Sequence, residues 1–540
     1  MKILVASNFF PPHFVGGAEI VAFQQAQALA ARGHDVRVFA GDARRNQPGY
    51  AINDDVYEGL PVRRVALSQQ DFQLGGNDVA HLQVDALFDQ WLDTWRPDVI
   101  HAHHLLGLSL GLIRVAHARG VPVYLTLHDH WGFCINSTRI TRAGQLCQDA
   151  SRCAADCCDF ITDGDTSLPL SLRQDYIRWQ LQAVTGFIVP SRYLAQAYQD
   201  AGLPAERVHL VPNGIALQRF ACRTSVTPAR VADTRLRILF IGYMGPHKGV
   251  PQLVQALARL PGQRIHVDFV GAGHALPEYR QALAATAPAV SAKFWGRLPN
   301  ADVVHRLAQA DVLVLPSVCP ENQPVSITEA MACGLPVVAS RIGGIPELVQ
   351  HQVTGLLAAP GDVDALAACL QHYVDHPAKL AEHGAAAQAR IQAFELSAQA
   401  EKLEALFAHR AAAPAVGFAV ACHGQPHPAV LSALRNTFAM PSPVLGNAST
   451  PAYLPAQWLQ PHAAQMLWVA GAPSRQAALS RVSDYRAASK PIVVDERNVR
   501  LLSHLDDDVV ICRGARQHAL ALAALCGSHA ALIDACVSGE

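Results

Sequence analysis

The sequence lacks long hydrophobic runs, an excess of either charge, and paired CxxC motifs. No apolar stretch approaches the ~18 residues that a membrane-spanning helix needs. The 43 lysines and arginines nearly balance the 44 aspartates and glutamates, which argues against a general electrostatic attraction to nucleic acid. We therefore expect no transmembrane helix and no nucleic-acid partner.

The N-terminal residues also lack the pattern of a signal peptide. Met1–Pro12 carries one charged side chain, and its short apolar run ends at two prolines. A signal peptide needs a longer apolar core followed by a cleavage site. We expect this segment to form a first β-strand and the protein to be cytoplasmic, with peripheral contact at the inner membrane surface left open.

Cysteines are unevenly distributed. The chain of 540 residues has 13 of them, too few for a disulfide scaffold, but five are crowded between residues 134 and 158. Such crowding in a cytosolic protein favours free thiols or a metal over disulfides. The spacing predicts a cysteine-rich surface loop and no required metal. The alternative is a metal site formed by Cys147, Cys153, Cys157 and Cys158.

The first 410 residues alternate between short apolar runs and helical patterns. The chain opens with a strand, a glycine-rich loop, a helix and a second strand, which is the start of a doubly wound α/β domain. A second series begins at Leu236. We predict two Rossmann-like domains at residues 1–220 and 235–410, joined by a linker at Ala221–Thr234. Open α/β sheets bind ligands at the carboxyl ends of their strands, so we expect a cleft between the domains.

Residues 415–540 follow an alanine-rich boundary at Ala411–Pro414. Their apolar runs, with helical patterns between them, predict a third, small α/β module of unknown role. We find no catalytic constellation in it. Asp495 and Glu496 follow a predicted strand, and we interpret them as part of a solvated loop.

The stretch Asp311–Val349 reads as strand, loop, helix, strand, loop and helix, and it carries two carboxylates near its first helix. Glu321 precedes this helix and Glu329 lies within it. A helix N-terminus suits a phosphate, and fixed carboxylates suit sugar or ribose hydroxyls. These features indicate a nucleotide-sugar site. For Glu329 the alternative is a capping box with Ser326, in which the glutamate has only a structural role.

Three further motifs lie near predicted strand ends. Gly16 and Gly17 precede a helix and allow a ligand to approach the backbone; the alternative is an ordinary tight turn. Lys248, in a turn between a strand and a helix, is able to meet a diphosphate, or else is a solvated surface lysine. His128 is a candidate hydrogen-bond donor, or a general base oriented by Asp129; the alternative is a polar residue that caps a buried strand.

Hydride transfer is disfavoured by the loop Gly271-Ala272-Gly273. This loop follows a strand, but the third glycine of a GxGxxG motif would fall at Leu276. The sequence therefore does not predict a dinucleotide-binding site here.

Taken in order, these motifs resemble those of the retaining glycosyltransferases of family 4, which have the GT-B fold. The resemblance covers about residues 1–410. Its most specific part is the E-x7-E stretch Glu321–Glu329, followed by EAMACGLPVVAS and GGIPELV. Supporting matches are GGAE at Gly16–Glu19, TLHDHW at Thr126–Trp131, VPNGI at Val211–Ile215, HKG at His247–Gly249 and VTGLL at Val353–Leu357. The resemblance implies an α/β protein with two Rossmann-like domains and an interdomain cleft, to which residues 415–540 add a small α/β extension.

The resemblance implies roles for the residues of the second domain. Lys248 would bind the donor diphosphate, and Glu329 would hold the ribose hydroxyls of the nucleotide. Glu321 would contact the transferred sugar as a catalytic residue, with the backbone N–H groups from Asn322 to Val325 beside the donor.

The first domain would supply His128, which would meet the donor sugar, and the pair Gly16 and Gly17, which would approach the phosphate or the acceptor. The implied reaction transfers a sugar from a UDP- or GDP-linked donor to a glycan or lipid-linked acceptor with retention at the anomeric carbon. Polysaccharide or surface-glycan biosynthesis is the expected setting. The leaving phosphate would help to remove the acceptor proton, and no metal or other cofactor is implied.

Two positions depart from the family pattern. Tyr243 stands where many members have an arginine that contacts the diphosphate, and Ala272 replaces an aspartate in a strand-end loop. The first departure removes a cation, and Arg297 is one candidate to compensate. Two alternatives to a glycosyltransferase stay open: a non-catalytic subunit that binds a nucleotide sugar, and a GT-B nucleotide-sugar epimerase.

Overall fold

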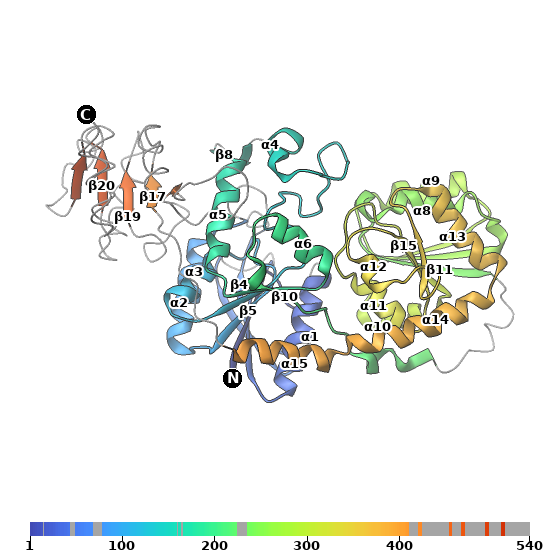
Figure 1. The fold of residues 1–540 in the computed structure, drawn as a ribbon, viewed down its shortest axis with the longest axis horizontal. Coiled ribbons are helices and arrows are strands. Elements are labelled where there is room, and N and C mark those ends of the chain that lie inside the picture. The colour runs from blue at the N-terminus through green and yellow to red at the C-terminus, as the bar shows by residue number, and fades with distance from the viewer. Residues whose placement is uncertain are drawn as a thin grey trace.

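The computed structural model describes residues 1–13, 16–43, 49–68, 78–158, 160–163, 166–223 and 235–409, together with five short strands between residues 420 and 512. Figure 1 shows the residues up to 409 as two α/β lobes. Most of the predicted linker, residues 224–234, lies outside the described residues. The division of the chain into domains at that linker stays a prediction.

An eight-stranded sheet forms the centre of the first lobe, in the order β10-β9-β6-β5-β1-β2-β4-β3. Every neighbouring pair is parallel except β3 and β4. Strands β5 and β6 are buried along their whole length, as expected for parallel strands covered on both faces. The strands are β1 (Lys2–Ser7), β2 (Asp35–Asp42), β3 (Ile52–Tyr57), β4 (Leu60–Ala66), β5 (Val99–Ala102), β6 (Val123–Thr126), β9 (Gly186–Val189) and β10 (Val208–Leu210).

The antiparallel edge strand β3 is not predicted by the sequence. Its residues, INDDVY, contain no apolar run, and three of them are exposed at the edge of the sheet. A tight turn at Glu58 and Gly59, both of which have positive φ, joins β3 to β4, and the two strands pair along their length. The other strands of this sheet begin and end within two residues of the apolar runs that predict them. These runs are Lys2–Asn8, His34–Ala40, Val62–Ala66, Val99–His104, Val123–His128, Gly186–Val189 and Val208–Val211.

Helices cover both faces of this sheet. They are α1 (Gly17–Ala31), α2 (Leu82–Thr94), α3 (Gly111–Ala118), α5 (Leu170–Gln182) and α6 (Arg192–Asp200). Helix α3 begins six residues after the predicted start at Leu105. The hydroxyl of Ser109 accepts hydrogen bonds from the N–H groups of His81 and Gly111, at 3.2 and 3.0 Å. The Ser109 side chain therefore stabilises a turn that precedes α3 in the chain.

The second lobe contains a six-stranded parallel sheet in the order β13-β12-β11-β14-β15-β16. Its strands are β11 (Leu236–Ile241), β12 (Ile265–Val270), β13 (Ser291–Gly296), β14 (Val312–Leu315), β15 (Val337–Ser340) and β16 (Gly355–Ala358). Its helices are α8 (Val250–Leu257), α9 (Leu276–Thr286), α10 (Asn300–Gln309), α11 (Val325–Ala332), α12 (Ile345–Leu348), α13 (Val363–Asp375) and α14 (Ala378–Ile391). The sequence predicts strands at the apolar runs Leu236–Ile241, Ile265–Val270 and Gly355–Ala358, and β11, β12 and β16 begin and end at these residues.

The last described helix, α15 (Leu396–Ala408), returns to the first lobe. Its residues Leu403 and Phe407 are buried in the core that α1 and β1 share. On the surface, Arg32 Nε of the first lobe donates to Glu404 Oε2 at 2.7 Å. Figure 1 shows α15 alongside α1, so the end of the segment predicted as residues 235–410 packs on the first sheet.

The five strands that follow form a separate parallel sheet in the order β18-β17-β19-β20-β21. Parallel pairing requires crossover connections, as in an α/β module. The segments between these strands, where the sequence predicts helices, lie outside the described residues. The strands are β17 (Val420–His423), β18 (Tyr453–Pro455), β19 (Met466–Val469), β20 (Ile492–Asp495) and β21 (Val509–Cys512).

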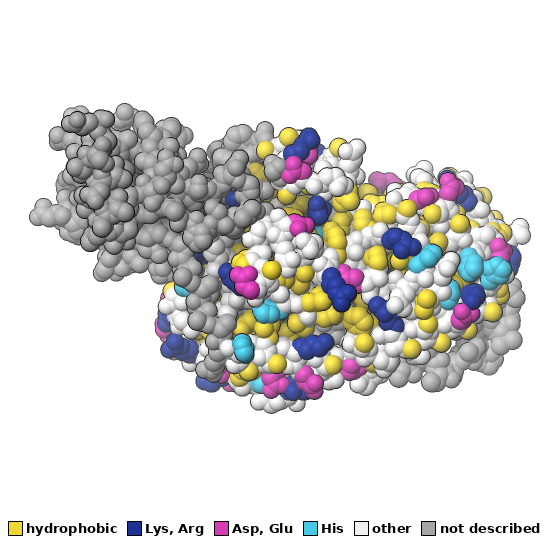
Figure 2. Space-filling model, viewed as in Figure 1, with side chains coloured by type: hydrophobic (Ala, Val, Ile, Leu, Met, Phe, Trp, Pro, Cys, Tyr) yellow, Lys and Arg dark blue, Asp and Glu magenta, His cyan; other side chains and the backbone are white. Residues whose placement is uncertain are grey.

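The surface agrees with the balanced composition. Figure 2 shows charged side chains of both signs scattered over one face of the two lobes. In the part of the chain that the structure describes, no helix is both long and apolar enough to cross a membrane.

Candidate functional site

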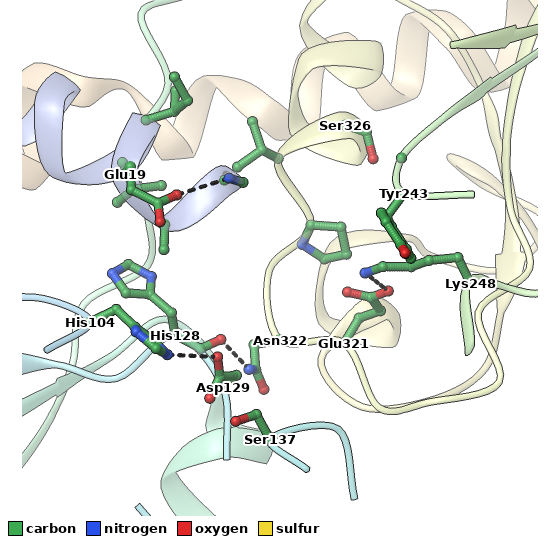
Figure 3. Close-up of a pocket in the computed structure, with 18 of the residues that line it drawn as sticks. Glu19, His104, His128, Asp129, Ser137, Tyr243, Lys248, Glu321, Asn322 and Ser326 are labelled. Carbon is green, nitrogen blue, oxygen red and sulfur yellow. Dashed lines mark hydrogen bonds and ion pairs between the residues drawn. The ribbon is translucent and has the colours of Figure 1, made fainter. Parts of the chain in front are cut away.

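Both lobes contribute to a cleft of about 1190 Å³, to which the carboxyl ends of the central strands lead. This volume exceeds the ordinary range for a small-ligand pocket, so the cleft has room for more than one small ligand. All eight site residues predicted from the sequence line this cleft: Gly16, Gly17, His128, Lys248, Glu321, Asn322, Val325 and Glu329. Figure 3 shows the residues of the two lobes facing one another across it.

The loop between β14 and α11 forms the wall of the second lobe. The motif GGIPELV supports it from behind, where the Gly344 N–H donates to the carbonyl oxygen of Glu321 at 2.7 Å. Gly343 has φ +59°, and a Cβ there would lie 2.1 Å from the same oxygen. The two glycines thus allow one loop to lie directly under the other.

An ion pair occupies the centre of this wall. Lys248 Nζ donates to Glu321 Oε1 at 2.6 Å, and the Ser317 hydroxyl donates to the same oxygen at 2.7 Å. Burial alone would raise the pKa of Glu321, but the charge of Lys248 and both hydrogen bonds hold it below its ordinary value. Glu321 is therefore an ionised carboxylate that faces the cleft (Figure 3).

Lys248 reaches this position through a close contact between two loops. Gly249 has φ +73°, and a Cβ there would lie 1.8 Å from the carbonyl oxygen of Pro316. The Val318 N–H also donates to the carbonyl oxygen of His247 at 2.9 Å. The HKG turn is thereby attached to the loop that follows β14, which brings the lysine to Glu321.

Glu329 does not form the capping box considered from the sequence. Helix α11 begins at Val325 with Pro324 as its N-cap, so Ser326 lies inside the helix and the capping-box interpretation is wrong. In the described part of the chain no residue donates a hydrogen bond to the Glu329 carboxyl. Burial raises its pKa to about 7. A carboxyl group that lines a cleft without a structural partner is available to a ligand.

His128 has a different partner from the one predicted. Its Nε2 lies 3.0 Å from His103 Nδ1, and the two rings stack. Burial, together with the nearby His104 and His101, lowers the pKa of His128 to about 3. The imidazole is therefore neutral at physiological pH, where it suits a hydrogen bond better than general base catalysis.

Asp129 does not orient His128. Its Oδ1 accepts the N–H of Trp131 at 2.8 Å, and its Oδ2 lies 3.6 Å from His104 Nε2. Figure 3 shows the His104–Asp129 pair beside the backbone of His128 rather than at its ring. The prediction of a His128–Asp129 pair is therefore wrong.

Gly16 and Gly17 bring the start of α1 to the cleft. The Glu19 carboxylate accepts the N–H of Gly16 at 3.0 Å, so it stabilises the first turn as the structural alternative proposed. A Cβ on Gly17 would lie 3.2 Å from Val325 Cγ2 on the opposite lobe. This glycine therefore permits close approach of the two lobes.

Several hydrogen bonds join the two lobes around the cleft. The Asn322 side chain donates to the carbonyl oxygen of His128. Gln323 exchanges two hydrogen bonds with the backbone of Asn213, at 2.7 and 2.8 Å. The Glu347 carboxylate accepts the first N–H groups of α6, from Arg192 and Tyr193, at 2.9 and 2.8 Å.

The positions that depart from the family pattern also line the cleft. Tyr243 is 47% exposed, and its ring stacks on that of His247 with the centroids 5.7 Å apart. Ala272 and Arg297 lie on the same wall. Arg297, the candidate to replace the missing cation, therefore lines the same cleft as Lys248 and Glu321.

The cysteine-rich segment forms another part of the wall. Among the described residues no group of histidine, cysteine and acidic side chains has the arrangement of a metal site, and Cys147, Cys153, Cys157 and Cys158 are free thiols. Cys153 packs with Ile135 and Leu170 in a small apolar cluster. Residues 135–138 of this segment line the cleft.

Some lining or supporting residues carry no signal in the sequence. Ser317 donates to Glu321 from only four positions away but belongs to no motif, whereas His103 lies in the run DVIHAHH at a predicted strand end and only its pairing with His128 was not foreseen. Asp78 and Arg173, which line the first-lobe part of the cleft, lie in stretches without a motif. Glu347 is part of GGIPELV, but its contact with α6 depends on how the lobes pack.

Comparison with known families agrees with this geometry. A model described as Glycosyltransferase Family 4 matches residues 15–219, and one described as Glycosyl transferases group 1 matches residues 235–376. The chain is 29% identical over 417 residues to a glycogen synthase of Mycobacterium tuberculosis, covering 72% of this chain and 90% of that protein. It is 27% identical over 386 residues to a D-inositol 3-phosphate glycosyltransferase of Acidothermus cellulolyticus, covering 67% and 78%.

Solved structures show the same fold. A sucrose-phosphate synthase from Thermosynechococcus elongatus matches with a TM-score of 0.58 and 22% identity, over 76% of this chain and 99% of that one. Anabaena Alr3699/HepE in complex with UDP-glucose matches with a TM-score of 0.55 and 19% identity, over 76% and 100%. The predicted GT-B fold with two Rossmann-like domains is confirmed.

Proposed function

Because the chain belongs to glycosyltransferase family 4, we propose that it is a retaining enzyme that transfers a sugar from a nucleotide sugar to a glycan or lipid-linked acceptor. The observation that carries this proposal is the Lys248–Glu321 pair, which lies in the cleft ahead of α11. A cation beside a helix N-terminus favours a diphosphate. A carboxylate held in a fixed direction favours sugar hydroxyls.

In the proposed reaction the bond between the anomeric carbon and the donor phosphate oxygen breaks. The acceptor oxygen bonds to the same face of that carbon, and its proton passes to the leaving phosphate. Negative charge grows on the diphosphate as the bond breaks, so Lys248 stabilises the transition state more than the ground state. The scheme uses this lysine and the loop N–H groups in place of a metal ion.

The remaining site residues take supporting roles in the proposal. Glu329, whose carboxyl lacks a described hydrogen-bond donor, accepts the ribose hydroxyls. Neutral His128 donates a hydrogen bond to the donor sugar, and the N–H groups from Asn322 to Val325 surround the donor. Gly16 and Gly17 leave room for the phosphate or acceptor at the start of α1.

Arg297 is the proposed second cation of the diphosphate site. Tyr243 cannot neutralise a phosphate, and it is stacked on His247. Arg297 lines the same wall of the cleft, and the length of an arginine side chain allows it to reach a bound diphosphate. The proposed donor is UDP-linked or GDP-linked. UDP-glucose is the first to test, because the similar structure of Alr3699/HepE is in complex with it.

Ligand-dependent thermal unfolding tests the donor assignment. We expect one of UDP-glucose, GDP-mannose, ADP-glucose and dTDP-glucose to raise the melting temperature, since a ligand at about 100 times its Kd stabilises the native state by about 2.7 kcal/mol. Transfer to an acceptor pool, with the anomeric configuration of the product read by NMR, then tests the reaction. Glycan or lipid-linked fractions of polysaccharide assembly are the appropriate pool.

Variants of the ion pair test the site. Glu321→Ala and Lys248→Ala are expected to abolish transfer while the fold survives, whereas Lys379→Ala removes a surface lysine that pairs with Glu382 and serves as the matched control. Full activity in either site variant contradicts the assignment. Nucleotide-sugar binding without turnover points instead to a non-catalytic subunit, and an altered free sugar without acceptor points to an epimerase.

A further inference from the structure

We propose that Asp78 and Arg173 form the acceptor subsite of the cleft and that this subsite takes the hydroxyl groups of an uncharged sugar. The inference rests on the proposed function, because it names the class of acceptor that the transferase uses. It concerns the wall of the first lobe, away from the Lys248–Glu321 pair.

The subsite contains a buried ion pair. Arg173 Nη2 donates to Asp78 Oδ2 at 2.5 Å, and the two side chains are only 2% and 5% exposed. Both residues nevertheless line the cleft. A charged pair that is withdrawn from water but placed on a ligand cleft is a costly arrangement if it serves packing alone.

Each member of the pair has a polar atom without a partner. Asp78 Oδ1 and Arg173 Nε are buried, and within the described part of the chain neither has a hydrogen bond. Leaving such buried atoms unpaired destabilises the folded protein. The pair therefore holds one unpaired acceptor and one unpaired donor just beneath the wall of the cleft.

The fold holds the pair close to the turns that follow β5, where His104 lies. Asp78 precedes α2, and its carbonyl oxygen accepts the N–H of Gly107 at 2.6 Å. Gly107 lies in the turns that follow β5, and these turns also contain His104 and Leu106. His104, Leu106 and Gly107 all line the cleft with Asp78. The subsite is thus continuous with the strand end that carries the histidines.

The charges of the subsite cancel, and this selects the ligand. A phosphate-bearing acceptor would bring its negative charge to the unpaired carboxylate oxygen Asp78 Oδ1. A sugar hydroxyl both donates and accepts hydrogen bonds, so adjacent hydroxyls satisfy Asp78 Oδ1 and Arg173 Nε together. Residues 135–138 of the cysteine-rich segment and Leu106 complete a wall of mixed polar and apolar character.

Binding of saccharides in the presence of saturating nucleotide tests this proposal. The probes are three neutral oligosaccharides, maltoheptaose, mannotetraose and cellotetraose, and two anionic monosaccharides, glucose 6-phosphate and mannose 6-phosphate. Saturation-transfer NMR measures each against the wild-type protein and against Asp78→Asn and Arg173→Met. We expect a neutral probe to bind, and each substitution to weaken it about 10- to 100-fold without changing the nucleotide Kd.

Two further variants keep the test decisive if the substituted ion pair prevents folding. Leu106→Trp leaves the pair intact and places a large ring on the subsite wall, so it should also block the neutral probe. Arg63→Met removes an arginine that pairs with Asp54 outside the cleft and should change nothing.

The proposal is overturned if only phosphorylated probes bind, if no probe binds to a protein that does bind nucleotide, or if the neutral probe binds all cleft variants equally. A protein that binds none of the nucleotide sugars fails the proposed function instead, and the subsite assignment falls with it.

Discussion

The ammonium group of Lys248 lies 2.6 Å from the carboxylate of Glu321, although 73 positions separate them in the chain. Each residue belongs to a different loop at the edge of the same sheet, and Gly249 permits the close contact that joins those loops. The pair keeps a carboxylate ionised where burial alone would favour the protonated form. It also places a cation where a departing diphosphate is expected.

Lys248→Met is predicted to raise the pKa of Glu321, because the buried carboxylate loses its counter-charge. We expect transfer to fall about 10²- to 10³-fold, the range for removal of one transition-state donor. Stability should fall by about 1 to 3 kcal/mol, as for a lost hydrogen bond to a charged group. Steady-state kinetics and urea unfolding measure the two effects. Lys379→Met is the control, and an unchanged kcat in Lys248→Met would contradict the role of the pair.

Glu329 should make nucleotide binding depend on pH. Its pKa is raised to about 7, and accepting ribose hydroxyls favours the ionised form. Below pH 7 the free protein therefore has to release a proton to bind, so Kd should rise about tenfold per pH unit and level off above 7. Calorimetric titration in two buffers of different ionisation enthalpy measures the released proton.

Glu329→Gln should bind nucleotide with an affinity that no longer changes over this range. It should also remove a pH effect on stability. Between pH 4.5 and about 7 the folded protein holds this proton, whereas in the unfolded chain the glutamate has its ordinary pKa of 4.5 and has lost it. The stability from the neutral form is thus present below about pH 4.5 and is lost as the pH rises to about 7. If the nucleotide Kd of Glu329→Gln still changed with pH in the same way, a group other than Glu329 would be the one that titrates.

Glu347→Ala should loosen the contact between the lobes. The carboxylate caps the first turn of α6 from across the interface, and loss of a helix cap costs about 0.5 to 2 kcal/mol. Asp362→Ala is a matched control, since Asp362 caps α13 by accepting the Ala365 N–H within one lobe.

Both cap variants should lower the melting temperature by similar amounts. Only Glu347→Ala should increase the radius of gyration in small-angle X-ray scattering and raise the donor KM. An identical scattering profile for the two variants would show that Glu347 stabilises α6 without holding the lobes together.

Gly343→Ala should displace Glu321, in addition to the strain that a positive φ imposes on any alanine. Both Gly343 and Gly361 have positive φ, +59° and +77°, but only at Gly343 would a Cβ meet another atom, 2.1 Å from the Glu321 carbonyl oxygen. Gly361→Ala should therefore cost about 1 to 2 kcal/mol and leave activity intact. Gly343→Ala should cost more and lower kcat. Equal stability and activity of the two variants would rule out a supporting role for Gly343.

Most of the fold could be predicted from the sequence, because parallel strands that are buried on both faces are continuous apolar runs. Strands β11, β12 and β16 begin and end where those runs do. Strand β3 escaped prediction because it lies at an exposed edge and is polar. Its formation depends on pairing with β4, which no local pattern reveals.

Part of the site could also be predicted from the sequence. Glycine, lysine and glutamate in strand-end loops identified which residues line the cleft, because parallel strands bring their carboxyl ends to one edge. The partners of those residues were not accessible. Asp129 is next to His128 in the chain, yet the ring of His128 meets His103 instead. Both residues lie beyond the end of β6, where Asp129 is in a bend and its carboxylate accepts the N–H of Trp131. Proximity in sequence therefore misled the prediction.

The sequence by itself determined the class of the protein, its two α/β lobes and the residues that line the cleft, since these follow from local periodicity and from motifs in order. Only the tertiary structure decided the chemistry of each residue. Burial set the pKa of Glu329 and His128, an ion pair kept Glu321 charged, and Pro324 rather than Ser326 is the N-cap of α11. Burial and contacts between distant segments depend on how the elements pack, and that information is absent from any single stretch of the chain.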